Sequence, residues 1–247
     1  MAMSVTVTVI GCGDAFSSGG NGATCFFVSA PHCNVLIDCG ATSLAGLKKN
    51  GLSADDVDVV VLTHFHGDHF GGMPFFLLDC ARQKRTKPLT IISPPGGKEK
   101  VFEAFSLFYP GSEHALETFQ IIYKEYSGRD TVALQELRLE SFPVIHTPQT
   151  LPHGIRLTVA GVTIAYTGDT EWCENIPYIL HETDLALCDC TFFEKQEKAH
   201  LNYRMLQQHL PEIVCKRLLL VHFDQEMLLN ANRVAPEMAK DGMVIQP

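Results

Sequence analysis

Long apolar runs are missing from this sequence of 247 residues. No stretch approaches the roughly 20 consecutive apolar residues that a membrane-spanning helix needs. The first four residues lead straight into the alternating apolar segment at 5–9, which leaves no room for a secretory signal peptide. We therefore expect a cytoplasmic protein that has no membrane partner.

Positive charge is also scarce. The sequence has 19 Lys and Arg residues against 28 Asp and Glu residues, which gives a formal net charge of −9. Non-specific nucleic-acid binding depends on neutralising phosphates, so this balance disfavours an RNA partner without excluding one. The one basic run, at 82–87, follows a predicted helix whose dipole its cations would complement. We interpret it as a solvated helix end, with a polynucleotide contact as the alternative.

Cys-x-x-Cys spacing is absent, although the sequence contains nine cysteines. Most of them lie in or beside apolar segments, which indicates buried, reduced thiols. Cys188 and Cys190 would share one face of a strand, but no further ligands for a metal are evident beside them. Repeats and low-complexity linkers are absent as well. The length suits one large domain, residues 1–247.

The segment at 64–69, His-Phe-His-Gly-Asp-His, places three imidazoles and a carboxylate within six residues. Imidazole suits zinc and other first-row metals, and carboxylate neutralises their charge. The β-branched run at 57–63 indicates a buried strand, and the apolar segment at 73–78 indicates a helix. We therefore expect the cluster on a loop between a strand and a helix, where α/β folds place ligand sites.

Three further candidate ligands follow at the ends of apolar, strand-like segments. His146 follows the segment 141–145, Asp169 follows 162–168, and His222 follows 217–221. Each residue alone is as well explained by a structural role. Together with the cluster they predict donors for two metal ions.

This series resembles the metal ligands of the metallo-β-lactamase-fold hydrolases, and the resemblance covers nearly the whole chain. The loop at 11–21 and the segment at 36–40 are similar to the phosphodiesterase branch, which includes tRNase Z. The resemblance implies an α/β fold, a four-layer αββα sandwich of two mixed sheets with helices on the outer faces. It also implies two sets of ligands that share Asp169 as a bridge: His64, His66 and His146, and Asp68, His69 and His222.

The resemblance further implies two divalent metal ions per chain. Zn²⁺ is the first expectation, and Mn²⁺ and Fe²⁺ accept the same mixture of imidazole and carboxylate. Asp68 would also orient the attacking hydroxide. The backbone amides of Gly19, Gly20 and Gly22 would approach the substrate, as glycine permits, although these glycines would equally suit a tight connection.

The segment at 187–192 resembles the His-Glu-Ala-Thr-Phe segment of tRNase Z-like enzymes. His200 then falls where those enzymes carry the histidine that protonates the leaving group. Two positions depart from the pattern: Asp189 stands in place of Glu, and Cys188 in place of His. A surface position in a charged loop is the alternative for His200.

The sequence therefore predicts a dinuclear metal-dependent hydrolase. Within that class we expect a phosphodiesterase that uses a metal-bridging hydroxide on a small or flexible phosphate ester. tRNA 3′-processing is an alternative, weakened by the acidic balance and by the lack, between 79 and 146, of the Gly/Pro- and Lys-rich arm of bacterial-type tRNase Z. Hydrolysis of a lactone, thioester or β-lactam, di-iron redox chemistry, and a non-catalytic metal-binding sensor or scaffold are further alternatives. A homo-oligomer is left open.

Hydrophobic periodicity predicts the secondary structure. Strands are expected near 4–10, 23–29, 33–38, 57–63, 88–92, 119–125, 132–142, 155–160, 162–167, 184–189 and 217–222. Helices are expected near 42–50, 71–84, 98–108, 173–181, 202–210 and 225–231. Ala160-Gly161 indicates a tight hairpin. The apolar stripe of Val101, Phe102, Phe105 and Phe108 is expected in the core.

Overall fold

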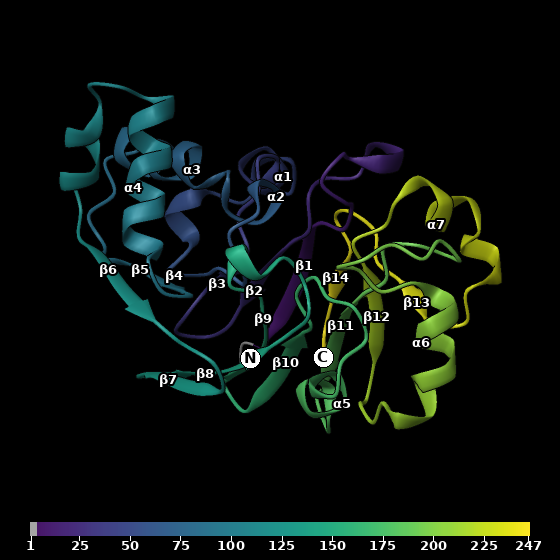
Figure 1. Ribbon diagram of the computed structural model, residues 1–247. Coiled ribbons are helices and arrows are strands. Elements are labelled where there is room, and N and C mark those ends of the chain that lie inside the picture. Colours follow the sequence, from purple (N-terminus) through teal and green to yellow (C-terminus); the bar gives the residue numbers. More distant parts are fainter. Residues whose placement is uncertain (1–3) are drawn as a thin grey trace.

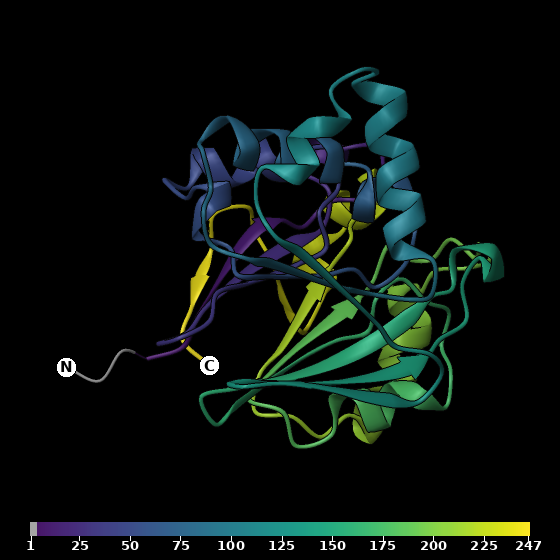
Figure 2. The same cartoon turned by 90° about the vertical axis from the view of Figure 1, so that its left-hand side faces the viewer.

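The protein is described by a computed structural model that covers residues 4–247. Two mixed β-sheets face each other, and helices cover the outer face of each sheet (Figure 1, Figure 2). This arrangement confirms the four-layer αββα architecture that the sequence predicted. No helix of the described residues is long and apolar enough to cross a membrane.

The first sheet has seven strands in the order β14-β1-β2-β3-β4-β5-β6. Their bounds are β1 (Thr6–Gly11), β2 (Cys25–Ser29), β3 (Val35–Ile37), β4 (Val59–Val61), β5 (Leu89–Ser93), β6 (Ile121–Glu125) and β14 (Val244–Ile245). The helices packed on its outer face are α1 (Ser43–Lys49), α3 (Met73–Arg82) and α4 (Gly97–Phe108). The short helix α2 (Gly67–Phe70) precedes α3.

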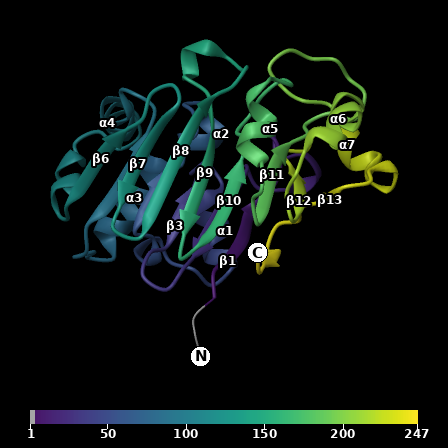
Figure 3. The same cartoon turned by 90° about the horizontal axis from the view of Figure 1, so that it is seen from below.

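The second sheet also has seven strands, in the order β13-β12-β11-β10-β9-β8-β7. Their bounds are β7 (Asp130–Leu134), β8 (Leu137–Pro143), β9 (His153–Val159), β10 (Val162–Tyr166), β11 (Leu185–Asp189), β12 (Leu218–Val221) and β13 (Glu237–Met238). Figure 3 shows strands β7 to β12 side by side, with α5 (Asn175–Leu180) and α6 (Tyr203–His209) on their outer face. Helix α7 (Gln225–Leu229) follows β12.

Short 3-10 helices connect many of these elements. They are η1 (Ser18–Gly20), η2 (Ala54–Asp56), η3 (Glu113–Glu117), η4 (Pro148–Thr150), η5 (Leu210–Glu212) and η6 (Ala231–Arg233).

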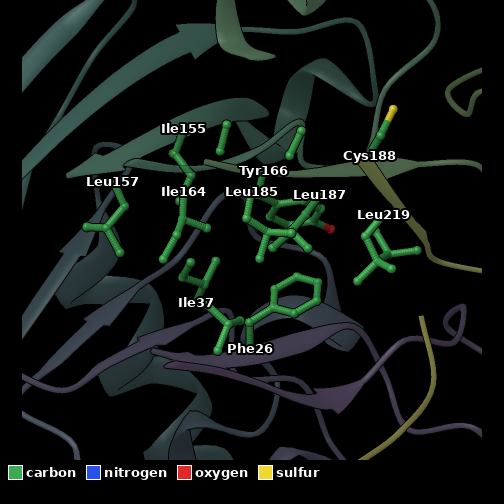
Figure 4. Packing of buried hydrophobic residues seen from close by; sticks show 14 of the residues in the cluster. Phe26, Ile37, Ile155, Leu157, Ile164, Tyr166, Leu185, Leu187, Cys188 and Leu219 are labelled. Carbon is green, nitrogen blue, oxygen red and sulfur yellow. The ribbon is translucent and has the colours of Figure 1, made fainter. Parts of the chain in front are cut away.

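The main core lies between the two sheets (Figure 4). Phe26 of β2 and Ile37 of β3 point toward residues of the second sheet, and the Phe26 ring meets the Tyr166 ring edge-on at 5.3 Å. Phe27 points the other way, into the helices over the first sheet, as the alternation of a strand requires. Because this core joins both sheets, we propose that residues 4–247 form one domain.

Strand direction determines where the candidate ligands meet. β8 and β10 are both antiparallel to β9, while β10, β11 and β12 are mutually parallel. The carboxyl ends of these four strands therefore lie at one edge of the second sheet. β4 is parallel to β3 and β5 in the first sheet and delivers the 64–69 segment. The loops after parallel strands are where α/β folds hold ligands.

Several predicted elements differ from the structure. The expected strand 132–142 is a hairpin, β7 and β8, joined at residues 135–136. The expected helix 71–84 begins later, as α3, and the separate turn α2 lies inside the 64–69 cluster. The two short strands near the C-terminus, β13 and β14, were not anticipated. Each adds one strand to a different sheet, a pairing that local sequence does not encode.

Two predictions about which side chains are buried were partly wrong. Val101 and Phe105 are buried as expected, but Phe102 and Phe108 are 50% and 47% exposed. In the basic run, Arg85 is buried rather than solvated. Its guanidinium donates to carbonyl oxygens of the loop at 54–57, including Val57 O at 2.8 Å. A buried arginine that satisfies several carbonyls holds two loops together, which charge spacing alone does not reveal.

Phe26→Ala should lower the free energy of unfolding by about 3–5 kcal/mol, because it leaves a cavity between the two sheets. Urea unfolding followed by circular dichroism measures this change. Phe102→Ala is the matched control, since this aromatic ring is half exposed. A loss for Phe26→Ala no larger than the loss for the control would contradict the inter-sheet core.

Candidate metal centre

The 64–69 segment is held by close backbone contacts with the chain after β3. Cys39 N donates to His69 O at 2.6 Å, and Gly72 N donates to Cys39 O at 2.8 Å. A Cβ atom on Gly40 would lie 1.8 Å from the Asp68 carbonyl oxygen. Only glycine permits that approach. The helical turn α2 is thereby fixed with Asp68 and His69 facing inward.

The first group of donor atoms comes from His64, His66, His146 and Asp169. His66 Nδ1 lies 3.3 Å from His64 Nε2 and 2.9 Å from His146 Nε2. Asp169 Oδ2 lies 3.8 Å from His64 Nε2 and 4.0 Å from His146 Nε2. Three strands of two sheets thus converge on one small space.

The second group comes from Asp68, His69, His222 and again Asp169. His69 Nε2 lies 3.2 Å from Asp68 Oδ2 and 3.1 Å from Asp169 Oδ2. His222 Nε2 lies 3.3 Å and 3.2 Å from the same two oxygens. Zinc held tetrahedrally at about 2.0 Å has ligand atoms roughly 3.3 Å apart. The separations in the second group match this value.

The hydrogen bonds of His69 also fit a metal ion. Its Nδ1 lies 2.7 Å from Asp38 Oδ2, which assigns the ring proton to Nδ1. Its Nε2 is buried and has no hydrogen-bond partner. A buried ring nitrogen without a partner is costly, and a divalent cation between His69 and the two carboxylates would satisfy it. The donor set therefore fits the ions that the sequence predicted.

Asp38 is a functional residue that the sequence analysis overlooked. It is fully buried, accepts hydrogen bonds from Thr63 N and Oγ1, and orients His69. It also adopts a left-handed backbone, φ 59°, which is unusual for a non-glycine residue. The sequence contained a signal for Asp38, because this residue directly follows the apolar strand β3, and Asp169 lies in a similar place three residues after the end of β10.

Other ligands have comparable support. His146 Nδ1 donates to Ala199 O at 2.6 Å. His222 Nδ1 lies 2.9 Å from Thr191 Oγ1, and its backbone is left-handed with φ 67°. Partners of this kind fix ring orientation and strengthen metal ligands. Thr191 belongs to the 187–192 segment, and its hydroxyl contacts both His222 Nδ1 and His200 Nδ1.

Protonation divides the imidazoles into two types. Burial lowers the pKa of His64 well below its ordinary value and lowers the pKa of His66 and His146 as well. These rings stay neutral and can donate a lone pair. Burial also opposes the charged form of His222, but Asp169 and Asp68 outweigh it and raise its pKa to about 9. The carboxylates of Asp169 and Asp68 thus favour a positive charge at the second group of donor atoms.

His153 lies outside both groups. Its Nδ1 donates to Leu151 O at 2.8 Å, and its ring packs against the Tyr126 ring. It belongs to β9, whereas His146 follows β8 into the site. This placement favours His146 as the ligand.

His200 lies beside both groups. Its ring stacks on the His222 ring at 5.1 Å and meets the His146 ring at 4.8 Å. Its Nδ1 lies 3.2 Å from Asp189 Oδ2 and 3.1 Å from Thr191 Oγ1, so Nε2 is the nitrogen left for a substrate. Burial alone would lower the pKa of His200, but the hydrogen bond and charge of Asp189 raise it.

The backbone amides of two of the three loop glycines are not free to approach a substrate as predicted. Gly20 N donates to Ser17 O at 2.9 Å, and Gly22 N donates to Asp241 Oδ2 at 2.8 Å. These two amides are therefore engaged within the protein. Gly19 packs near Leu228, where an added Cβ would lie 2.5 Å from that side chain. These contacts favour the alternative interpretation, a tight connection, for Gly20 and Gly22, and the substrate-binding role of Gly19 stays a prediction.

A family model described as Anti-Pycsar protein Apyc1 matches residues 5–243. The chain belongs to this Apyc1 family.

Several curated relatives of this Apyc1-family chain are named Ribonuclease Z. One from Metallosphaera sedula is 26% identical, over 87% of this chain and 89% of its own length. Another from Sulfurisphaera tokodaii is 25% identical, over 93% of both chains. They confirm the tRNase Z-like branch of the metallo-β-lactamase superfamily.

Solved structures confirm the fold. Human tRNase Z, short form, superimposes with a TM-score of 0.80 at 23% identity, covering 98% of this chain and 99% of that chain. A diphosphatase from the PhnP family gives a TM-score of 0.78 at 17% identity, covering 98% of each chain. Together with the His/Asp cluster, the comparisons identify the Apyc1-family chain as a metal-dependent hydrolase that binds divalent metal.

Protein purified without chelator should contain close to two metal ions per chain by elemental analysis. His66→Ala should lose metal and activity together, because His66 donates centrally in the first group. His153→Ala should retain both ions, since its ring lies outside the groups. Retention of metal by His146→Ala combined with its loss in His153→Ala would reverse the assignment. A stoichiometry of zero after reconstitution with Zn²⁺ and Mn²⁺ would refute the dinuclear centre.

Asp38→Asn should weaken metal affinity by about 10–100-fold, the usual effect of losing a carboxylate that orients a ligating histidine. Competition with a chromogenic chelator measures this affinity. Asp58→Asn is the control, because that carboxylate binds Asn34 N and Lys87 away from the centre. Equal affinities for the two variants would mean that Asp38 has only a structural role.

Proposed function

We propose that this chain is a dinuclear phosphodiesterase that acts on a small or flexible phosphate ester. The observation that carries the proposal is the position of His200 beside both donor groups, with its Nδ1 held by Asp189. A general acid is needed where an alkoxide departs, which is the demand of diester cleavage. Zn²⁺ is the expected ion, with Mn²⁺ and Fe²⁺ as alternatives.

The residues divide the chemistry as follows. Two divalent ions bound by the groups would supply Lewis acidity and lower the pKa of a water between them. Asp68 orients that water from the side of the second group. His200 Nε2 gives its proton to the departing oxygen, and Asp189 stabilises the charged imidazole before the transfer. Asp189, which departs from the family pattern, therefore keeps the carboxylate function of the usual Glu.

Two cavities flank the centre and support a small substrate. One of about 420 Å³ is lined by His200, and one of about 620 Å³ is lined by Asp68, Phe75 and Phe108. Both fall in the size range of small-ligand sites. The exposed Phe108, which was expected in the core, lies in this second lining.

RNA processing is the second candidate function. Relatives named Ribonuclease Z favour it, and the expectation that RNA is disfavoured rests on the net charge and the missing arm alone. Carboxylic substrates remain the alternative for the same ions. Turnover of bis(p-nitrophenyl) phosphate, a pre-tRNA, a lactone and nitrocefin, each with Zn²⁺, Mn²⁺ and Fe²⁺, separates these functions. Faster hydrolysis of the lactone or of nitrocefin than of any phosphodiester would overturn the proposed reaction class.

His200→Ala should slow a diester with a poor alkyl leaving group by about 10²-fold or more, the range expected for lost acid catalysis. Its effect on a p-nitrophenyl diester should be small, because p-nitrophenolate departs without a proton. Steady-state kinetics on both substrates measure the difference. His181→Ala is a matched histidine control, since the His181 side chain is exposed and lies 3.8 Å from Glu182, outside the metal groups. Equal losses on both diesters would make His200 a structural or substrate-binding residue.

A further inference from the structure

The cavity beside His200 is lined by several residues that have no role in the proposed reaction. It measures about 420 Å³, and besides His200 its lining includes Trp172, Asn202 and Met205. The lining comes from the loop after β10 and from the start of α6, so it lies on the side of the centre that faces the acid. A group attached to the departing oxygen would enter this space.

Trp172 is the most distinctive residue of that wall. It is the only tryptophan in the chain. One side of its indole stacks on the His209 ring, with centroids 3.9 Å apart and planes within 13°. His209 does not line the cavity, so the indole surface that does is the part His209 leaves uncovered. The ring also packs against the core, so the indole is held in one position at the cavity wall.

We propose that this cavity binds the leaving group of the diester, and that Trp172 selects leaving groups that carry a flat ring. The inference rests on the proposed phosphodiesterase function and adds the class of substrate. Stacking of a ring on an aromatic side chain accepts many flat groups and rejects puckered ones of similar size. Trp172 is thus a specificity residue.

The charges of the residues that line the cavity also indicate which leaving groups can bind there. Glu171 is acidic and Lys198 is basic, while the second acidic residue of the lining, Glu197, forms an ion pair with Lys195. The Glu171 carboxylate already accepts from Ala199 N at 2.7 Å, and its charge remains. Like charges across a binding surface are unfavourable. The lining has no excess of positive charge to bind further phosphates, which favours an uncharged leaving group over a polynucleotide.

The reaction balances as a hydrolysis. The water oxygen bonds to phosphorus, and the bond from phosphorus to the leaving oxygen breaks with its electron pair on that oxygen. The leaving oxygen takes the proton of His200 Nε2, and the proton that the water loses returns to His200 Nε2 by way of solvent. The products are a phosphate monoester and an alcohol, and the alcohol carries the flat ring out of the cavity.

The kinetic test uses two substrates, methyl 2-phenylethyl phosphate and methyl 2-cyclohexylethyl phosphate. Their leaving alcohols share an alkyl oxygen of similar basicity and differ in flatness. The metal-loaded protein should prefer the phenyl diester in kcat/KM. Trp172→Leu should reduce that preference about tenfold, as expected for the loss of one stacked ring, whereas Trp172→Phe should retain most of it. An unchanged preference in Trp172→Leu would overturn the proposal.

A second pair of variants guards against misfolding of the Trp172 variants. Met205 lies on the exposed side of α6 and lines the cavity, so Met205→Glu adds a charge there without disturbing the core. It should raise KM for the phenyl diester several-fold. Val214→Glu is the control, because Val214 is exposed before the start of β12, at the opposite end of the sheet. Equal KM values for the two variants would contradict binding in this cavity.

A binding measurement separates this inference from the proposed reaction. The single indole Nε1–H gives one resolved NMR signal, and a flat ring stacked on it shifts that signal by its ring current. The product alcohol 2-phenylethanol should shift the signal of the zinc-loaded protein, and 2-cyclohexylethanol should leave it in place. A shift without any phosphodiester turnover would keep the cavity and refute the reaction. Turnover with no shift and no phenyl preference would keep the reaction and refute the role of Trp172.

Discussion

The fully buried carboxylate of Asp169 is the constraint on which the rest of the centre depends. Its Oδ2 lies within 4.0 Å of ring nitrogens from both donor groups. A carboxylate removed from water needs opposite charge close by. With Asp68 also ionised, two negative charges adjoin five imidazoles, and divalent cations satisfy both the carboxylates and the unpartnered His69 Nε2. The two sheets bring this arrangement together because their strand ends meet at one edge.

Holding ligands from two sheets in one space requires unusual backbone at their supports. Asp38 and His222 have φ angles of 59° and 67°, and Ala199 has 76°. Such conformations cost free energy and persist only where surrounding contacts determine them. Ala199 is bound on both sides, since its N–H donates to Glu171 and its carbonyl accepts from His146. The loop that carries His200 is therefore tied directly to a metal ligand.

The two sides of the centre differ in character. The side of His200 has a cavity with one fixed indole, and the side of Asp68 has a cavity with partly exposed phenyl rings. This asymmetry matches a reaction with distinct leaving and retained groups. The Apyc1 family match and the relatives named Ribonuclease Z are consistent with a hydrolase centre of this kind. The residues that line the two cavities would determine which substrate binds.

Residue type and local order determined all the candidate ligands, and the family resemblance that these residues carry predicted the fold class. An imidazole cluster after a buried strand, and an acid or histidine after later strands, carry their signal within a few residues. Tertiary structure alone decided the support from Asp38, the burial of Arg85 and the closing strands β13 and β14. The bonds to Ser17 and Asp241 that occupy the amides of Gly20 and Gly22 were decided there too. Most of these depend on which surfaces meet after folding, and contacts between residues 28 to 219 positions apart leave no periodicity in the sequence.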